Sequence, residues 1–328
     1  MIPEFLSQPV SRRQFTLGSA LGVAALTLMP SRTVFTAAAQ DASDLSGLGY
    51  PELAITITET GFEGVPDSPR AGRYLLKVTS KITKDSGSNG AVAFISPTPA
   101  GMSAADFIQL AASSAATPAA GGTPIAGGDQ GGGDENQQIP LSVYQMRFAG
   151  GVTTSPGGTA EAVIDLTAGE YVVWGDDPTA VQKPVILTVT GDFPNDVKDP
   201  QADITATLID FAIQLEGNLT AGKHLMKVQH HGAQPHFLYI SKGPDTMTTE
   251  QVQTALMGDP SATPAPGGLL EQDLQPVFYS PTQSIGTVTY QQIELTAGTF
   301  LATCFFPTAG TGVPHAMNGM IDVFKVTG

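Results

Sequence analysis

The sequence predicts an all-β fold made of two tandem β-sandwiches. Of the 328 residues, 37 are glycine and 25 are proline, and only 14% of the chain is charged. This composition is typical of short strands joined by turns and not of long helices. Segments in which apolar and polar residues alternate occur in both halves of the chain, as expected for half-buried strands. A chain of this length can form two domains, each with its own hydrophobic core.

Residues 1–39 are predicted to be an export signal that is removed. Arg12 and Arg13 lie in the run Ser-Arg-Arg-Gln-Phe-Thr-Leu, which resembles the twin-arginine signal, and an apolar stretch over residues 15–29 follows. Three alanines at positions 37–39 are small residues that a signal peptidase accepts. The alternative is a membrane anchor, but the apolar stretch is shorter than the ~20 residues of a spanning helix. We therefore expect an exported protein, either periplasmic or extracellular and at the cell surface, that crosses the membrane already folded by the twin-arginine pathway.

An internal repeat predicts that the chain contains one domain twice. Residues 71–78 and 221–228 are identical at five of eight positions. Further pairs follow in the same order: residues 165–171 with 294–300, which share Leu-Thr-Ala-Gly, and residues 189–191 with 326–328, which are both Val-Thr-Gly. Because the order is preserved, the repeat indicates duplication of a whole domain and not of a single hairpin.

The domain boundaries follow from this repeat. The N-terminal domain is predicted over residues 48–191 and the C-terminal domain over residues 203–328, with a proline-containing linker over residues 192–202. The N-terminal domain carries an insert, residues 113–139, that consists almost wholly of Ala, Gly, Pro, Thr, Asp and Gln. Such a segment cannot bury a hydrophobic core, so it is predicted to be disordered.

Each domain is predicted to contain six to eight short strands and one short helix. Strand segments with a clear pattern are residues 54–58, 163–166 and 171–174 in the first domain, and 204–209, 287–290 and 300–303 in the second. The helices are expected over residues 103–112 and 248–257, where a Ser or Thr opens the segment and an acidic residue follows within the first turn. Strands at this spacing favour a β-sandwich in each domain.

The charge and the single cysteine exclude several classes of function. The formal net charge of −15 argues against nucleic acid as a partner, since that would require basic patches. One cysteine cannot form an internal disulfide, so the thiol is free, buried or a ligand. The chain has no Gly-x-Ser-x-Gly, and Cys304 lies beside Phe305 and Phe306 instead of at a helix start, so a serine or cysteine hydrolase is not supported.

Candidate metal ligands are confined to the second domain. It holds the only cysteine and all five histidines: His224, His230, His231, His236 and His315. A thiolate with two imidazoles and a weak thioether is the donor set of a blue-copper site. His236, Cys304, His315 and Met320 supply that set in the required order, with the last three around one late loop.

This arrangement resembles the cupredoxin family, which includes plastocyanin and azurin. The residues that carry the resemblance are the Pro235-His236 pair, followed by Cys304, His315 and Met320 before the last expected strand. The resemblance implies a Greek-key β-sandwich for each domain and one type 1 copper per chain, bound by these four residues. It also implies transfer of single electrons, by way of His315, between redox proteins of the cell envelope. No small-molecule substrate and no enzymatic activity are expected.

One feature departs from most small cupredoxins: ten residues separate Cys304 from His315. If this loop folds back on itself, Pro307 and Pro314 would shape it, and Gly310 and Gly312 would allow it to turn. Met317 is an alternative to Met320 as the axial ligand.

The first domain serves as an internal comparison, because the repeat places residues without donor atoms suited to copper at three of the four positions. Ala91 is opposite His236, Gly175 is opposite Cys304, and Lys183 is opposite Met320. The fold itself therefore does not require the four candidate ligands.

Other interpretations of the same residues remain open. Cys304 could be an ordinary buried thiol. His224, His230 and His231 are most simply surface histidines, and the alternative is that they bind a second ion loosely or form a copper-delivery surface. The chain could be a copper carrier or sensor that transfers no electrons, or a metal-free scaffold or adhesion protein. A multicopper oxidase or nitrite reductase is disfavoured, because there is no His-x-His and the neighbour of Cys304 is Thr303 instead of histidine.

Overall fold

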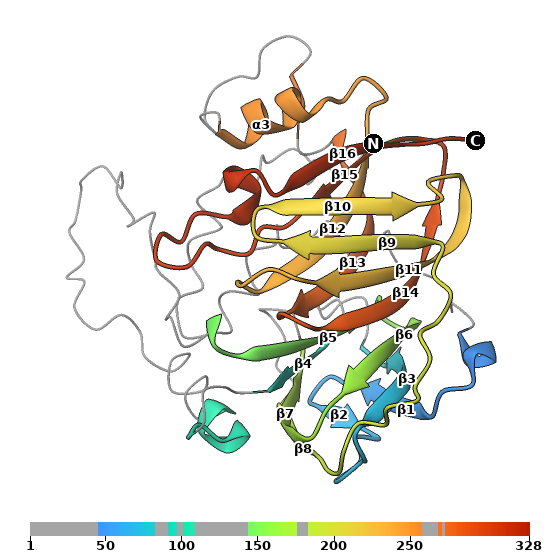
Figure 1. Cartoon of the computed structure of the whole chain (residues 1–328), viewed down its shortest axis with the longest axis vertical. Coiled ribbons are helices and arrows are strands. Elements are labelled where there is room, and N and C mark those ends of the chain that lie inside the picture. Colours follow the sequence, from blue (N-terminus) through green and yellow to red (C-terminus); the bar gives the residue numbers. More distant parts are fainter. Residues whose placement is uncertain are drawn as a thin grey trace, which may run out of the picture.

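The computed structural model describes residues 45–82, 91–96, 101–108, 144–175, 183–257, 268–270 and 273–328. Within these ranges the chain consists mainly of strands, which form two sheets of eight strands each. Figure 1 shows how these strands are arranged. The predicted all-β class is confirmed. The expected signal over residues 1–39 and the insert over residues 113–139 lie outside the described residues. Among the described residues, no helix has both the length and the apolar character required to cross a membrane.

The first sheet has the strand order β10-β9-β11-β14-β6-β3-β1-β2. In that order its strands are β10 (Ala212–Gly217), β9 (Ile204–Ile209), β11 (Gly222–His230), β14 (Val288–Leu295), β6 (Thr159–Leu166), β3 (Gly72–Ser80), β1 (Glu52–Ile57) and β2 (Phe62–Glu63).

The second sheet has the strand order β16-β15-β12-β13-β5-β4-β7-β8. In that order its strands are β16 (Ile321–Val326), β15 (Gly298–Thr303), β12 (His236–Gly243), β13 (Gln275–Gln283), β5 (Arg147–Thr153), β4 (Ala91–Ser96), β7 (Gly169–Trp174) and β8 (Val185–Val189).

The helices are short and lie at the margins of the sheets. The helix α3 (Thr249–Met257) is capped by Thr248, whose Oγ1 accepts the backbone N–H of Gln251, while Gln251 Oε1 accepts the N–H of Thr248. This reciprocal capping box makes Thr248 the cap, so the helix begins at Thr249, one residue after the predicted start. Residues 104–108 are also helical, and the rest of that predicted helix lies outside the described residues. The described residues also include two 3-10 turns, η3 (Ser46–Leu48) and η6 (His315–Asn318).

Strands β1–β8 and β9–β16 pair in the same order. In the first half β1 runs parallel to β3 and antiparallel to β2, and in the second half β9 runs parallel to β11 and antiparallel to β10. The same holds in the second sheet, where β4 pairs with β5 and β7, and β12 pairs with β13 and β15. Ala91 begins β4 and His236 begins β12, so the two residues matched in the sequence comparison occupy the same place in their strands.

The two halves share both sheets, an arrangement that the sequence repeat did not predict. Strand β6 pairs with β14 in the first sheet, and β5 pairs with β13 in the second. Figure 1 shows β14 beside β6 at the middle of the molecule. A strand at the edge of a sandwich exposes unpaired backbone groups, and pairing with the other half covers them.

The two largest hydrophobic cores are centred on different halves, although the core of the second half also takes in first-half side chains such as Phe148 and Trp174. In the first half, side chains such as Ile55 from β1, Leu76 from β3 and Tyr171 from β7 are buried together. In the second half the core includes Met226 from β11 and Phe300 from β15, and it also contains Cys304 and Met320. The candidate ligands are therefore part of the interior of the second half.

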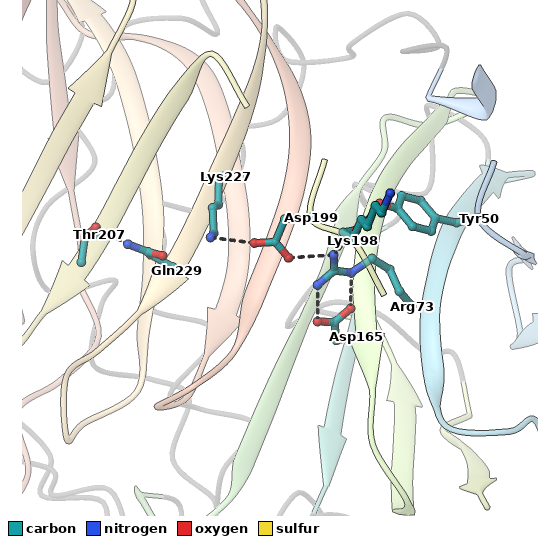
Figure 2. A network of polar contacts seen from close by, with 8 residues as sticks. All are labelled: Tyr50, Arg73, Asp165, Lys198, Asp199, Thr207, Lys227 and Gln229. Atoms are coloured by element: carbon teal, nitrogen blue, oxygen red, sulfur yellow. Dashed lines mark hydrogen bonds and ion pairs between the residues drawn. The ribbon is translucent and has the colours of Figure 1, made fainter. Parts of the chain in front are cut away.

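A buried arginine connects the halves through the segment that links them. Figure 2 shows Arg73 between Asp165 and Asp199. Its Nε and Nη2 donate to the two carboxylate oxygens of Asp165 at 2.7 and 2.8 Å, and Nη1 donates to Asp199 Oδ1 at 2.9 Å and to the carbonyl of Lys198 at 2.8 Å. The second oxygen of Asp199 accepts a hydrogen bond from Lys227 Nζ on β11 at 3.1 Å.

Charge pairing in this network opposes the cost of burial. The pKa of Arg73 is raised, mainly by its hydrogen bonds to Asp165, although desolvation acts to lower it. Desolvation alone would raise the pKa of Asp199, but the hydrogen bonds from Arg73 and Lys227 outweigh it and lower the pKa to about 2. The linking segment is thus held against β3 and β11 by charged groups on both sides.

Replacing Arg73 by alanine is expected to lower the free energy of unfolding by about 2–3 kcal/mol, because several charge-assisted hydrogen bonds to one buried side chain are lost. Chemical denaturation measures this change. The matched control is Lys81→Ala, which breaks an ion pair with Glu63 whose partners are 62% and 60% exposed. An exposed pair is worth less than about 1 kcal/mol. Equal effects of the two substitutions would contradict a stabilising role for the Arg73 network.

Candidate metal centre

Three of the four predicted ligands converge within the core of the second half. His236 is the first residue of β12, Cys304 directly follows β15, and His315 begins η6. The Nδ1 atoms of the two histidines are 2.9 Å apart, and Cys304 Sγ lies 3.8 Å from His236 Nδ1 and 3.7 Å from His315 Nδ1. These three ligand atoms lie close enough together to bind one metal ion. Among the described residues, no other group of three or more His, Cys, Asp or Glu side chains does so.

Backbone contacts set this convergence. A register shift in the pairing of β12 with β13 occurs just after His236, and such a bulge changes the direction of the strand's side chains. The N–H of Cys304 donates to the carbonyl of Met320 at 3.3 Å, and the N–H of Met320 donates to the carbonyl of His315 at 2.9 Å. The end of β15 and the start of β16 are thereby held together around the site.

The ten-residue loop between Cys304 and His315 folds back on itself. Pro307 and Pro314 form an isolated antiparallel bridge, and the N–H of Thr308 donates to the carbonyl of Val313 at 2.8 Å. The turn is made by glycines with positive φ, 79° at Gly310 and 72° at Gly312. The expectation that this loop is shaped by its prolines and turned by its glycines is confirmed, and the fold-back explains how His315 returns to Cys304.

The spacing of the three donor atoms fits a first-row metal ion. In a triangle of 2.9, 3.7 and 3.8 Å, a point about 2.0 Å from each nitrogen lies about 2.1 Å from the sulfur in the same plane. These values are close to ordinary metal–imidazole and metal–thiolate distances. A trigonal plane of two imidazoles and one thiolate is the arrangement that favours copper in a blue site.

The outer hydrogen bonds of the histidines direct both Nδ1 lone pairs into the site. His236 Nε2 is 2.9 Å from Asp210 Oδ1, and a carboxylate can only accept, so Nε2 carries the proton. His315 Nε2 faces Gln234 Oε1 at 3.5 Å, and this oxygen also accepts the N–H of Ala309 at 2.6 Å. The two Nδ1 atoms are 2.9 Å apart beside a sulfur atom. A cation that replaced the proton between them would be bound by the lone pairs of both nitrogens.

Burial keeps the site neutral when it holds no ion. His236, Cys304, His315 and Met320 are all 0% exposed. Desolvation lowers the pKa of His236 to about 3 and that of His315 to about 4, and it raises the pKa of the Cys304 thiol to about 12. The free site thus holds two neutral imidazoles and a thiol, and a metal ion would bind with release of the thiol proton.

Met320, and not Met317, lies in the core with the other candidates. Met320 is fully buried in the same hydrophobic cluster as Cys304, whereas Met317 is partly exposed on η6. The backbone hydrogen bonds of Met320 join it to both His315 and Cys304. Burial therefore favours Met320 over Met317.

The interpretation of three further histidines as surface residues is wrong for two of them. His230 is 0% exposed, and its ring stacks on His236 with centroids 4.7 Å apart and an interplanar angle of 21°. Neither of its ring nitrogens has a hydrogen-bond partner among the described residues. His224 is also buried, with Nε2 2.7 Å from the carbonyl of Thr220, and only His231 is exposed. Adjacent strand residues point to opposite faces, which places His230 inside and His231 outside.

Three residues around the site were missed in the sequence. Asp210 and Gln234 contact the outer nitrogens of the two histidines, and the ring of Phe211 meets His315 edge-on, with centroids 5.3 Å apart. Asp210 and Phe211 precede His236 by more than 20 positions, so nothing local in the sequence connects them to it. Only the pairing of β9 with β10 and β11 brings them to the site.

Comparison with known proteins yields solved structures only; no family model and no curated protein matches the chain. The similar structures include auracyanin from Roseiflexus castenholzii, at 16% identity over 38% of this chain and 95% of that chain, with a TM-score of 0.26. Auracyanin A from Chloroflexus aurantiacus, described as a "blue" copper protein, is 20% identical over 38% of this chain and 97% of that chain, with a TM-score of 0.24. An azurin from Methylomonas sp. strain J is 13% identical over 38% and 96% of the two chains, with a TM-score of 0.23. Because these TM-scores are far below 0.5, the similarities assign neither a family nor a function to this chain. The evidence for a metal centre is the arrangement of the donor atoms in the structure.

Proposed function

We propose that this chain is an exported type 1 copper protein that transfers single electrons between redox proteins outside the cytoplasm. The observation that carries the proposal is the buried triangle of His236 Nδ1, His315 Nδ1 and Cys304 Sγ. His236, Cys304 and His315 would hold one copper ion, with Met320 as a further, weaker ligand. Copper bound there would supply a one-electron couple between Cu(I) and Cu(II).

The protein's own contribution is a rigid, dry set of donors. Asp210 and Gln234 fix the orientation of the two imidazoles, and the folded loop over residues 305–314 fixes His315 against Cys304. Because all four candidate side chains are fully buried, water is excluded from the donors. A site that does not rearrange between two charge states is suited to electron transfer.

The burial of His315 leads us to propose an electron route that extends beyond this residue. His315 was predicted as the exit, but its imidazole is 0% exposed and a partner cannot touch it directly. The half-buried ring of Phe211 contacts His315, and we propose that electrons leave from His315 by way of this contact. The partner would dock over the end of the sandwich that carries Phe211 and η6.

We also propose that the chain arose by domain duplication and that its N-terminal half binds no copper. The repeated pairing order of β1–β8 and β9–β16 supports the duplication. Gly175 directly follows β7, as Cys304 directly follows β15, so the thiol position of the first half holds no donor. Export would follow the twin-arginine route, as the signal predicted over residues 1–39 implies.

Electron transfer can be separated from copper carriage by one experiment on the copper-loaded protein. We expect rapid, reversible reduction and reoxidation by one-electron reagents, with slow loss of copper to a strong chelator, because the donors are buried. A copper carrier would show the opposite pattern, with fast transfer of the ion to the chelator. The control is His231→Ala, which changes an exposed histidine next to His230 and should alter neither rate.

A further inference from the structure

A single two-residue turn contacts both imidazoles of the candidate site. Strands β9 and β10 form a hairpin in which Ile209 and Ala212 are paired, so Asp210 and Phe211 alone make the turn. Asp210 accepts a hydrogen bond from His236, and the ring of Phe211 lies edge-on to His315, with an interplanar angle of 87°. Two ligands that are 79 residues apart in sequence are thus contacted by two consecutive residues.

The backbone of this turn is strained at Phe211. Its φ of 63° lies in the left-handed region, and it is the one residue other than glycine with a positive φ in the described parts of the chain. A bulky side chain is disfavoured there, and glycine or asparagine would be the usual choice. Such strain persists where surrounding contacts demand it, and here the contact is the one between the Phe211 ring and His315.

Asp210 is itself held in place by the segment that leads into His236. Its Oδ2 accepts the N–H of Ala233 at 3.1 Å, and its Oδ1 accepts the N–H of Gln234 at 3.1 Å as well as the proton of His236 Nε2. Gly232 lies so close that a Cβ on it would collide with the carboxylate of Asp210 and would approach His236 Nε2 to 2.5 Å. The carboxylate of Asp210, the segment over residues 232–234 and the imidazole of His236 are therefore closely packed and hydrogen-bonded to one another.

The turn at the same place in the first half has none of these features. There β1 and β2 pair at Ile57 and Phe62, which leaves a four-residue turn over residues 58–61. That turn is closed by its own hydrogen bonds, with Thr58 Oγ1 donating to the carbonyl of Gly61 and accepting the N–H of Gly61. The half without histidines thus has a self-contained turn, and the half with the donor triangle has a shorter turn directed at it.

We infer that Asp210 and Phe211 are positioning residues that fix the tautomer of His236 and the orientation of His315 for copper. This inference rests on the proposed function and adds which residues tune the site. Asp210 makes His236 a stronger donor by holding the proton on Nε2, which favours Cu(II) over Cu(I). Phe211 prevents rotation of the His315 ring out of the donor plane.

The first test reads the imidazole directly and needs no metal. In the metal-free protein, the ¹⁵N chemical shifts of His236 should show the proton on Nε2, and Asp210→Ala should give a mixture of the two tautomers. The matched control is Asp203→Asn, which removes a carboxylate at the other end of β9 that accepts the N–H of Leu225 at 2.9 Å. An unchanged tautomer of His236 in Asp210→Ala would overturn the role of Asp210, whether or not the protein binds copper.

The second test reads the copper site. Asp210→Asn is expected to lower Cu(II) affinity about 10- to 100-fold, as is usual for the outer partner of a metal-bound histidine. A tenfold larger loss for Cu(II) than for Cu(I) raises the midpoint potential by about 59 mV. Phe211→Gly removes the strained φ and the ring contact, and it should speed copper loss to a chelator about 10-fold without lowering the stability of the fold.

The outcomes separate this inference from the proposed function. In one outcome the wild-type protein binds copper with a thiolate absorption band, but the midpoint potential and copper exchange rate of Asp210→Asn and Phe211→Gly equal those of Asp203→Asn. The positioning role then fails and the proposed function stands. If the wild-type protein binds no copper but the tautomer of His236 depends on Asp210, then the proposed function fails and Asp210 remains a positioning residue. A folding defect in either variant would appear in chemical denaturation and would contradict a role confined to the site.

Discussion

Replacing Cys304 by serine is expected to abolish the strong visible absorption of the copper-loaded protein. That absorption arises from charge transfer between a thiolate and Cu(II), and Cys304 is the only thiol in the chain. Serine is close in size to cysteine, and its hydroxyl can hydrogen-bond to one of the two Nδ1 atoms that lie 3.7 and 3.8 Å from the sulfur. The fold should therefore survive while the band disappears.

Two measurements make this substitution decisive. Far-ultraviolet circular dichroism and denaturation should show a folded protein, and metal analysis should show weakened copper binding, since two imidazoles and a thioether remain. The control is Met317→Leu, which changes the partly exposed methionine of η6 and should leave the band in place. A band that persists in Cys304→Ser would show that Cys304 is not a copper ligand.

The metal-free protein is expected to lose stability steeply as the pH falls below about 6.5. His230, His236 and His315 are fully buried, and desolvation lowers their pKa values to about 4, 3 and 4. In the unfolded chain each would titrate near 6.5. Between pH 6.5 and 4 the unfolded state therefore binds more protons than the folded state, so the free energy of unfolding decreases as the pH decreases.

The size of this effect is large because three groups act in the same direction. A pKa lowered from 6.5 to about 4, as for His230 and His315, corresponds to about 3 kcal/mol per residue, a substantial share of the stability of a typical domain. Urea unfolding of the metal-free protein at a series of pH values measures it.

His230→Phe isolates one histidine from this pH dependence. A phenyl ring can stack on His236 as the imidazole does, and it removes two ring nitrogens that have no partner among the described residues. The nearby backbone of Gln234 raises the pKa of His230 slightly, which offsets part of the desolvation. It does not reach hydrogen-bond geometry with either ring nitrogen of His230. We expect equal or higher stability at pH 7 and a shallower fall at pH 5. A pH dependence unchanged from that of the wild-type protein would show that His230 is not buried as a neutral group.

The sequence was sufficient to predict the candidate ligands because their chemistry is carried by residue type and order. His236, Cys304 and His315 do come together, and the loop between the last two folds back as its prolines and glycines indicated. Strand and helix positions also followed from local patterns: residues 204–209 were predicted as a strand and are β9, and α3 begins one residue after the predicted start.

The surroundings of the site could not be predicted because they depend on which strands become neighbours. Asp210 is a turn residue with no local sign of function, and it reaches His236 only because β9 lies beside β11. The burial of His230 depends on which face of β11 points inward. The continuity of the two sheets across the halves depends on edge pairing between β6 and β14, which leaves no periodic trace in the sequence.

Titration of the metal-free wild-type protein with copper, followed by visible absorption and by metal analysis, tests the copper centre most directly. We predict an intense thiolate-to-Cu(II) band that grows in proportion to added copper and stops at one ion per chain, because the described residues contain one donor triangle of His236, Cys304 and His315. Copper that binds without this band, or a protein that takes up no copper at all, would contradict the type 1 site.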